Sequence, residues 1–571
     1  MSPARWQIRP ADESAVKAIA EQARLPQSIA RVLALRGIEA SQRIDEYLNP
    51  RLAHLSDPFL LPDMERAAAR IWRAIDDGEA ISVFGDYDVD GVTSTALLMR
   101  VFAKLGANVA AFIPDRIDEG YGLSLDALER CLAEHGSKLV VSVDCGVNSV
   151  ASIKAAQAQG VDVIVTDHHE PGETTAPAYA LVNPKLGDGP ELEILSGVGV
   201  AFKLAHALVK LGRGQGKRTA ATVDLRDYID LVALGTVADI VPLVDENRIL
   251  VRHGLARLDE TKWIGLAALK EVAGVKGETD TVHLGFQLGP RINAAGRIGQ
   301  PMQALRLLVT DDAAEARRIA KLLDDTNAER RRIEREMAEE AFVEIDGYFD
   351  PEKHFGLVVA REGWHPGVVG IVASRVSRHY NRPSIVMGIE PDGSARGSCR
   401  SIDEYNMLDG LQACETYLNK FGGHKMAAGL EVKSGALDAF KTAFNSAVAA
   451  ELAQVDLSPV LHIDAVVEAG DVGWDFLEQM KRLRPFGQDN PEPVWALMGA
   501  RVSGSPRVVG QKHLKISLVA ENNTFDAIAF NYPLDRLPAG EIDVAFRLQE
   551  NNWMGNTSLQ FQIRGIRPSA R

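Results

Sequence analysis

The sequence predicts an α/β protein with a parallel-sheet domain, a long helix leading to a second α/β domain, and an all-β domain after that. Three observations support this prediction. Short β-rich runs alternate with helical segments from about residue 80 to 170, a charge-dense helical segment begins near 311, and several short β-patterned runs follow residue 457. Strand–helix–strand alternation is typical of a parallel sheet covered by helices on both faces.

The first part of the chain, 1–55, has helical patterning from about residue 11 to 48. The parallel-sheet domain is predicted over 56–305. Its strands are the runs AISVFGD, KLVVSVDCG and VDVIVTDHH, with helix-like segments such as VTSTALLMRVFAKLG and VASIKAAQAQG between them. Aspartate stands at the end of each run, and ligands of such sheets bind beyond the carboxyl ends of the strands. This edge of the sheet is therefore the predicted site.

A connecting helix is predicted over 306–345, because the segment from Asp311 to Phe342 contains neither glycine nor proline. Its predicted buried stripe consists of Ile319, Leu322, Leu323, Thr326, Ile333 and Met337. A second α/β domain is predicted over 346–455, with the strands GLVVA and PSIVMG on either side of the helix GVVGIVASRVSRHY. The last domain, 456–571, contains five β-rich runs, which fit a small oligonucleotide-binding (OB-like) barrel.

The composition is that of a globular protein without a membrane span. Of 571 residues, 46% are hydrophobic and 25% are charged, and no apolar run approaches the length of about 20 that a span needs. The four cysteines form no Cys-x-x-Cys pair, which argues against disulfides and structural zinc, so we expect a cytoplasmic protein. The net charge of −15 would oppose nucleic-acid binding unless basic residues gather locally. From residue 500 onward, nine Lys/Arg indeed stand against six Asp/Glu.

Carboxylates and imidazoles gather at the predicted strand ends. They are Asp86, Asp88, Asp144, Asp167, His168 and His169, and Asp239 joins them from the apolar run GTVADIVPL. A single aspartate at a strand end is usually a cap or a turn residue, which is the role expected of Asp90, and adjacent histidines are often solvated. All of them together favour a metal site, since crowded carboxylates need cations. Oxygen ligands with one or two imidazoles suit Mn²⁺ or Mg²⁺ better than a closed zinc site.

The motifs DYDVDG, DCG, DHH and VADIVPL resemble, in this order, the DHH phosphoesterase superfamily. Together with GPRINAAGR, ARGSCRS and GGHKMAAG, they are similar over about 80–430 to the RecJ family of single-strand-specific 5′→3′ exonucleases. The resemblance implies two ions, Mn²⁺ or Mg²⁺, held by Asp86, Asp88, Asp144, His168 and Asp239, with Asp144 bridging them. It implies Asp88, Asp144, His168 and His169 as catalytic residues, with His169 facing the scissile phosphate and Asp167 orienting an imidazole.

One position departs from the wider superfamily. Many of its members have a histidine four residues before the first aspartate, where this chain has Ser82. One ion would therefore lose a nitrogen ligand and bind weakly. The resemblance still implies two-metal phosphodiester hydrolysis that releases 5′-mononucleotides in DNA recombination and repair.

Further residues are expected on the substrate side of the site. The candidates are Arg116, Tyr121, His169, Arg291, Arg396, Ser398, Arg400 and His424. Arg116 could grip a phosphate, Tyr121 could stack on a base, and Arg291 is preferred to Arg297, which could serve a domain interface instead. The resemblance implies that the ARGSCRS segment holds a 5′-terminal phosphate, whereas His365 could act as a local cap. In the last domain the candidates are Lys512, His513, Lys515, Phe530, Tyr532 and Trp553.

Two alternatives stay open. The first is a phosphodiesterase of the same superfamily that acts on short oligonucleotides, cyclic dinucleotides or pyrophosphate, although such chains typically lack a long β-rich extension. The second is a non-catalytic DNA-binding scaffold, although such proteins lose metal ligands that this chain keeps. The expected partners are single-stranded DNA with a 5′ end and, from the resemblance, a single-strand-binding protein and a helicase. The sequence does not decide between Mn²⁺ and Mg²⁺ or between DNA and RNA.

Overall fold

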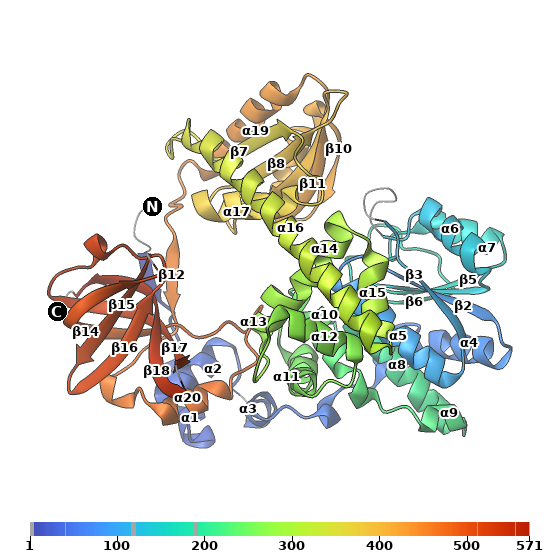
Figure 1. Ribbon diagram of the computed structural model, residues 1–571, viewed down its shortest axis with the longest axis horizontal. Coiled ribbons are helices and arrows are strands. Elements are labelled where there is room, and N and C mark those ends of the chain that lie inside the picture. Colours follow the sequence, from blue (N-terminus) through green and yellow to red (C-terminus); the bar gives the residue numbers. More distant parts are fainter. Residues whose placement is uncertain are drawn as a thin grey trace.

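The chain folds into three lobes, and Figure 1 shows one long helix running between two of them. The computed structural model describes residues 5–39, 41–115, 122–187, 189, 192–510, 512–553 and 555–569. Within these residues, no helix is both long and apolar enough to cross a membrane.

The first lobe is built on a five-stranded parallel sheet. Its strands are β2 (Ala80–Gly85), β3 (Asn108–Phe112), β4 (Leu139–Val143), β5 (Asp162–Thr166) and β6 (Ala180–Val182), in the order β3-β2-β4-β5-β6. Every neighbouring pair is parallel. The central strands are rich in Val and Ile and almost fully buried, as expected when helices cover both faces. The predicted parallel-sheet domain is confirmed.

Helices on the two faces of this sheet form separate cores. One face packs against α5 (Val89–Leu105), α8 (Gly197–Gly214) and α10 (Ile229–Ala238), and the other against α6 (Leu125–His135) and α7 (Val150–Ala158). Because α5 starts directly after β2, the carboxyl end of the strand and the amino end of the helix meet at the same edge. That edge carries the predicted site.

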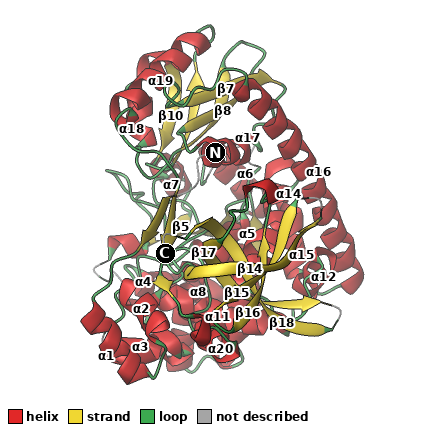
Figure 2. Ribbon diagram, turned by 90° about the vertical axis from the view of Figure 1, so that its left-hand side faces the viewer, coloured by secondary structure: helices red, strands yellow, loops and turns green. Residues whose placement is uncertain are grey.

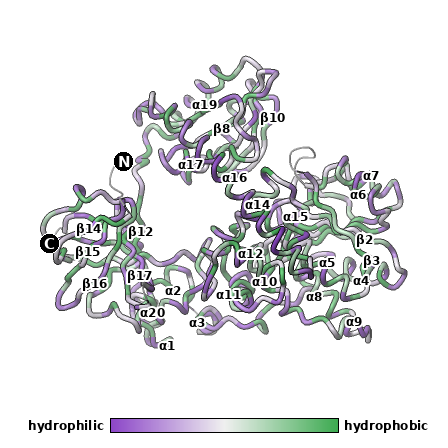
Figure 3. Tube along the Cα trace, in the orientation of Figure 1, coloured by the Kyte–Doolittle hydropathy of each residue, from purple (hydrophilic) through white to green (hydrophobic). Residues whose placement is uncertain are grey.

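The connecting helix α16 (Ala313–Asp346) is 34 residues long and begins at Asp312, whose side chain accepts hydrogen bonds from the amides of Ala314 and Glu315. Much of its trace has the hydrophilic colour in Figure 3. The amino-terminal half packs into the core of the first lobe, beside α12 (Ile264–Ala273), α14 (Gly289–Ile298) and α15 (Pro301–Val309). The carboxyl-terminal half belongs to the core of the second lobe. One rigid element therefore spans both lobes.

The buried stripe of α16 differs from the predicted one at one position. Leu322 is 43% exposed, whereas the small side chains of Ala316 and Ala320 are fully buried. Close approach of the neighbouring helices favours alanine at the contact, so an apolar pattern that counts only large side chains misplaces the stripe by part of a turn.

The second lobe contains a mixed five-stranded sheet in the order β10-β11-β9-β8-β7. The strands are β7 (Leu357–Glu362), β8 (Ser384–Ile389), β9 (Ala395–Arg400), β10 (Leu418–Gly423) and β11 (Ala427–Val432), flanked by α17 (Val369–Tyr380) and α19 (Leu437–Leu452). Only β7 and β8 are parallel; the remaining pairs are antiparallel.

The third lobe is a barrel built from β14 (Trp495–Val509), β15 (His513–Ala520), β16 (Asn523–Ala529), β17 (Glu541–Trp553) and β18 (Asn556–Pro568). Pairing of β14 with β17 closes it, which confirms the predicted OB-like domain. The amino-terminal helices α1 (Glu13–Ala23), α2 (Gln27–Leu35) and α3 (Ser41–Leu48) lie against it in Figure 2 and share its core. Strand β1 (Arg5–Ile8) also pairs with β12 (Val460–Ile463). The two ends of the chain thus form one folding unit.

A buried arginine joins the first lobe to this unit. Arg248, on α11 (Asp245–Asp259), donates hydrogen bonds to the backbone carbonyls of Tyr47, Leu483 and Arg482 at 3.0–3.1 Å. Its guanidinium carbon lies 3.8 Å from the centre of the Tyr47 ring. Burial lowers the pKa of Arg248 to about 10, which still leaves it charged at neutral pH.

Candidate metal centre

Four elements of the first lobe deliver polar side chains to one edge of the sheet. Asp86 and Asp88 follow β2, Asp144 follows β4, and Asp167, His168 and His169 follow β5. Asp239 is the residue that ends α10. Parallel strands align their carboxyl ends, so side chains that are up to 153 positions apart in the chain meet at this edge.

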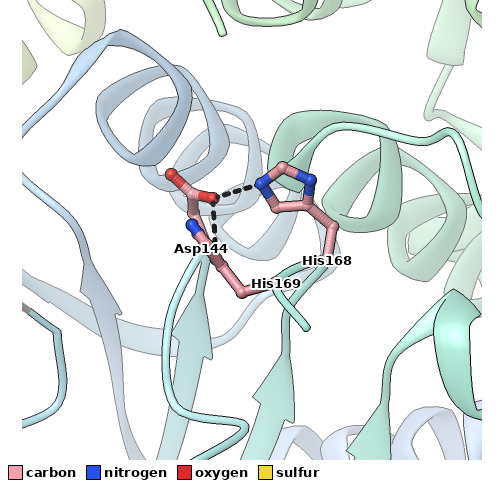
Figure 4. Close-up of side chains that lie close together, drawn as sticks. All are labelled: Asp144, His168 and His169. Atoms are coloured by element: carbon pink, nitrogen blue, oxygen red, sulfur yellow. Dashed lines mark ion pairs between the residues drawn. The ribbon is translucent and has the colours of Figure 1, made fainter. Parts of the chain in front are cut away.

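The two histidines and the surrounding carboxylates lie within a few ångströms of one another. His168 Nε2 is 3.1 Å from Asp144 Oδ1, 3.5 Å from Asp239 Oδ2 and 3.9 Å from Asp90 Oδ2. Figure 4 shows the Asp144 carboxylate joined by dashed lines to both imidazoles, and His169 Nδ1 is 3.9 Å from Asp144 Oδ1.

These atoms form three overlapping groups in which the ligand atoms lie within 4.8 Å of one another. The groups are Asp86–Asp88–Asp144, Asp144–His168–His169, and Asp90–His168–Asp239. Asp144 belongs to two groups and His168 to two, so the cluster has room for more than one ion with shared ligands. All five residues predicted to hold metal lie within it.

Asp90 is the member that the sequence did not predict. Asp88, not Asp90, caps its own helix, accepting a hydrogen bond from the amide of Gly91 at 3.1 Å. The Asp90 carboxylate is buried and accepts hydrogen bonds from the amides of Gly197 and Val198, at 2.6 and 2.8 Å. It therefore caps the amino end of α8, more than 100 residues away. Asp90 thus acts as a helix cap, as expected, but the helix is a distant one, because this contact depends on the tertiary fold.

Asp167 orients His169. Its carboxylate accepts hydrogen bonds from the amides of Val147, His168 and His169 at 2.8–3.1 Å, and it lies 2.8 Å from His169 Nδ1. Burial alone would raise the pKa of Asp167, but these bonds outweigh it and the pKa is lowered. Burial would likewise lower the pKa of His169, and the bond to Asp167 instead raises it. His169 is therefore held with Nδ1–H donating to Asp167 and Nε2 directed elsewhere.

The pKa of His168 is shifted in the opposite direction from that of His169. Burial, together with the charge of His169, lowers the pKa of His168 to about 3, so its imidazole is neutral at physiological pH. A neutral imidazole offers a nitrogen lone pair, which is the form that binds a metal ion.

The carboxylates at the centre of the cluster are protonated much more readily than ordinary ones. Burial, together with the charge of Asp88, raises the pKa of Asp90 to about 7. Burial and neighbouring carboxylates raise the pKa values of Asp144 and Asp239 well above their ordinary value. Asp144 Oδ1 and His168 Nε2 are both buried, and neither has a hydrogen-bond partner among the described residues. Such groups fit divalent cations, which would replace the missing partners and neutralise the charge.

The backbone is strained at two points of the cluster. Asp144 has φ +60°, and Ile240, which follows Asp239, has φ +63°. A positive φ is rare for any residue with a side chain and especially so for a β-branched one. Two glycines of the cluster also have no space for a side chain. A Cβ on Gly91 would lie 2.5 Å from the carbonyl oxygen of Asp86, and one on Gly197 would lie 2.6 Å from Asp144 Oδ1.

Ser82 contributes nothing to the cluster. It is fully buried within β2, and its hydroxyl lies 2.6 Å from the hydroxyl of Ser137. Asn183, which the sequence did not single out, instead supports the site from β6, because its Nδ2 donates to the carbonyl of His169 at 2.9 Å.

The predicted substrate residues occupy several places. Arg116 and Tyr121 lie outside the described residues. Arg291 forms an ion pair with Asp324 of α16 at 2.9 Å and donates to the carbonyl of Gln287. Arg297 donates to the carbonyl of Gly367 in the second lobe, which is the interface role considered for it. The guanidinium of Arg291 is thus engaged between helices, so its proposed contact with substrate requires an exchange of partners.

The ARGSCRS segment lies in the second lobe on β9, facing the start of α17. A Cβ on Gly370 would lie 3.1 Å from Ser398 Oγ and 3.3 Å from Arg400 Nη2, so these side chains approach the first turn of the helix. Arg396 pairs with Glu431 at 3.1 Å. His424 is exposed in the turn between β10 and β11. His365 accepts a hydrogen bond from the amide of Gly367 through Nδ1, which is a local capping contact.

Most of the candidates in the barrel also have local partners. Lys515 pairs with Asp526 at 3.1 Å, and the hydroxyl of Tyr532 donates to the carbonyl of Arg536. His513 lies edge-on to Phe530, which is 49% exposed. Lys512 is exposed, and the side chain of Trp553 lies outside the described residues.

Comparison with known proteins identifies each lobe. The DHH family, N-terminal domain, matches residues 80–236, the DHHA1 domain matches 354–450, and the RecJ OB domain matches 463–565. The single-stranded-DNA-specific exonuclease RecJ of Escherichia coli is 37% identical, over 96% of both chains. RecJ of Bacillus subtilis is 38% identical, over 99% of this chain and 71% of its own. The crystal structure of RecJ from Thermus thermophilus in complex with Mn²⁺ superposes with a TM-score of 0.85 at 33% identity, covering 99% of this chain and 80% of that one.

Substitution of Gly197 by alanine tests whether the cluster is a metal site. In Gly197→Ala the new methyl group displaces the Asp144 carboxylate, so we expect Mn²⁺ affinity, measured by calorimetry, to fall at least tenfold. Gly214→Ala is the matched control, because it lies at the other end of α8 with open space around it. Gly214→Ala should bind Mn²⁺ like the parent. Equal affinities in all three proteins would contradict the assignment.

The raised pKa values predict how metal binding depends on pH. The pKa values of Asp90, Asp144 and Asp239 are higher in the metal-free folded protein than in the unfolded chain, so the contribution of each to stability decreases as pH rises, which for Asp90 happens from about pH 4 through 7. Cations bind the deprotonated carboxylates. The increase in melting temperature caused by Mn²⁺ should therefore be larger at pH 8 than at pH 5.5, and binding at pH 7 should release protons into the buffer. A pH-independent increase would contradict this account.

Proposed function

The chain belongs to the RecJ family of single-stranded-DNA-specific exonucleases, and from that premise we propose that it hydrolyses single-stranded DNA from the 5′ end and releases 5′-mononucleotides. The observation that carries the proposal is the buried cluster around Asp144, in which several carboxylates and a neutral imidazole converge and in which Asp144 Oδ1 and His168 Nε2 have no hydrogen-bond partner among the described residues. Its ligand set is that of a divalent metal centre for phosphoryl chemistry.

The ions we propose are Mn²⁺ or Mg²⁺, two per chain. Asp86, Asp88 and Asp144 would hold one, and His168 and Asp239 the other, with Asp144 close to both. When bound, such ions supply a nucleophile at neutral pH and neutralise charge on the phosphodiester. Asp90 borders the position of the second ion. Hydrogen bonds from two backbone amides fix its carboxylate at the amino end of α8, so it limits how far apart the ligands of this ion can move.

His169 is the protein's own acid at the site. Its raised pKa favours the protonated imidazole, and Asp167 occupies Nδ1, so Nε2–H is the group that would donate to an oxygen of the scissile phosphate. Because Asp167 is itself held by three backbone amides, the ring keeps its orientation without substrate. This arrangement supports the proposed role of His169 beside the metal centre.

The second lobe would hold the 5′ end. Arg400 and Ser398 approach the amino end of α17, where backbone amides favour an anion. Arg396 and His424 would border this site. The spacing between it and the metal centre is set by packing rather than by a flexible linker, because α16 enters both cores. A fixed spacing supports release of one nucleotide at a time.

Two alternatives are less well supported. A phosphodiesterase for small substrates has no evident use for a closed barrel that matches the RecJ OB domain. A non-catalytic scaffold would not need the complete cluster of carboxylates and imidazoles. A single-strand-binding protein and a helicase, which could supply the strand, are proposed partners on the family resemblance alone.

A nuclease assay on 5′-labelled strands tests the proposal. With Mn²⁺ present, we expect the parent to release labelled mononucleotides from single strands, and to leave a blunt duplex intact. Asp144→Asn keeps the shape of the side chain but removes its charge, so it should lower kcat by 10³-fold or more, roughly the cost of losing a central electrostatic group. Internal cleavage, or activity in Asp144→Asn equal to the parent, would contradict the proposal.

Arg400 allows a separate test of end recognition. Arg400→Ala should lower kcat/KM on 5′-phosphorylated strands by about 10- to 100-fold, the range of a charge-assisted contact, and have little effect on strands with a 5′-hydroxyl. Arg378→Ala is the control, because Arg378 lies in the last turn of α17, away from its amino end. An equal loss on both kinds of end would remove the phosphate site from the proposal.

A further inference from the structure

The fifth strand of the parallel sheet also ends at the metal edge. Strand β6 pairs in parallel with β5, with Val182 opposite Thr166. The residues that follow β6 therefore lie beside those that follow β5, which are Asp167, His168 and His169. They are Asn183, Pro184 and Lys185.

The turn that carries Lys185 is fixed rigidly to the histidine segment. Asn183 is fully buried; its Oδ1 accepts a hydrogen bond from the amide of Lys185 at 2.9 Å, and its Nδ2 donates to the carbonyl of His169 at 2.9 Å. The 3₁₀ turn Pro184–Leu186 is closed by the amides of Leu186 and Gly187. One buried side chain thus sets the position of Lys185 relative to His169.

The side chain of Lys185 reaches back over the same segment. Its Nζ lies 2.8 Å from Glu170 Oε1, and Glu170 is the residue after His169. The Lys185 side chain is 26% exposed and that of Glu170 is 64% exposed. An exposed ion pair of this kind contributes only about 0–1 kcal/mol to stability, so the pair has little value as a structural brace. A stronger anion can therefore displace the carboxylate of Glu170 from Lys185.

The charge of Lys185 also acts on two of the proposed metal ligands. Burial dominates the pKa shifts of Asp239 and His168, and the ammonium of Lys185 opposes the rise at Asp239 and adds to the fall at His168. The acidic edge of the sheet thus has a cation at the end formed by β6.

We propose that Lys185 is a substrate-binding residue, which leaves Glu170 when DNA arrives and donates to a non-bridging oxygen of a phosphate at the metal centre. Glu170 holds the ammonium in place while no strand is bound. The inference rests on the proposed nuclease function and adds to it a phosphate contact that none of the sequence motifs identified. As a compact point charge, a lysine suits such a contact without requiring bidentate geometry.

The test compares four variants with the parent on a 5′-phosphorylated single strand with Mn²⁺. Lys185→Met should lower kcat/KM by about 10- to 100-fold, the range of one charge-assisted hydrogen bond, and Lys185→Arg should recover most of that loss. Glu170→Gln should lower KM, because it removes the competing carboxylate. Lys138→Met is the matched control, since Lys138 is exposed directly before β4, at the opposite edge of the same sheet. The kcat/KM of Lys138→Met should equal that of the parent.

Two further measurements separate a phosphate contact from a structural role. The dependence of log KM on log salt concentration should become shallower by about 0.7 in Lys185→Met, the change expected for one lost phosphate contact with a single strand. Mn²⁺ affinity should not fall below that of the parent, because Lys185 is not a ligand and removing its positive charge does not oppose cation binding.

The outcomes distinguish this inference from the function it rests on. A parent without nuclease activity would refute the proposed function. An active parent with Lys185→Met equal to Lys138→Met would refute only the role of Lys185. Loss of Mn²⁺ affinity in Lys185→Met, or equal losses of activity in Lys185→Met and Glu170→Gln, would show that the pair supports the structure, and would also overturn the inference.

Discussion

The structure of the first lobe depends on the electrostatic cost of bringing several carboxylates together in a buried place. Hydrogen-bond donors of the protein offset part of this cost. Asp90 and Asp167 each accept hydrogen bonds from backbone amides, and the pKa of Asp167 is lowered as a result. Asp144 has no such compensation at Oδ1, and it is the residue whose backbone is held at φ +60°. Some of these carboxylates therefore accept hydrogen bonds from the protein, and the others are left for cations to bind. This division, rather than the number of acids, identifies the metal centre.

The strand ends could be predicted from the sequence because they are a local pattern: a run of Val and Ile, then an aspartate, then a helix. This pattern also predicts that Asp86, Asp144 and His168 lie at one edge of the parallel sheet. Asp90 could not be placed in this way, since its partners are the amides of Gly197 and Val198 on a different helix. Lys185 was missed for a related reason, because the run before it, ALV, is only three residues long and looks like a loop.

Contacts between distant parts of the chain were the least predictable feature. Helical patterning in the first 55 residues gave no sign that this segment shares a core with the barrel, or that β1 pairs with β12 across 455 positions. The role of Arg291 is similar. A glycine-rich context suggests an arginine that is free to bind phosphate, but its partner Asp324 lies on the connecting helix, where the sequence shows only one acid among many. Pairing of surface charges is decided by packing, which sequence patterns do not encode.

The same contacts explain why a long helix can serve an enzyme that acts on chain ends. A helix of 34 residues is about 50 Å long, and it would transmit bending if it touched each lobe at a single point. Instead, Ile319 and Leu323 lie in the core of the first lobe, and Ala341 and Ile345 lie in that of the second. At the junction, a Cβ on Gly367 would lie 2.2 Å from the carbonyl oxygen of Arg297, so the two lobes touch backbone to backbone. Any rotation of the second lobe must break this contact. The distance from the metal centre to β9 is therefore set by packed cores, and a constant distance suits the proposed removal of one nucleotide per step.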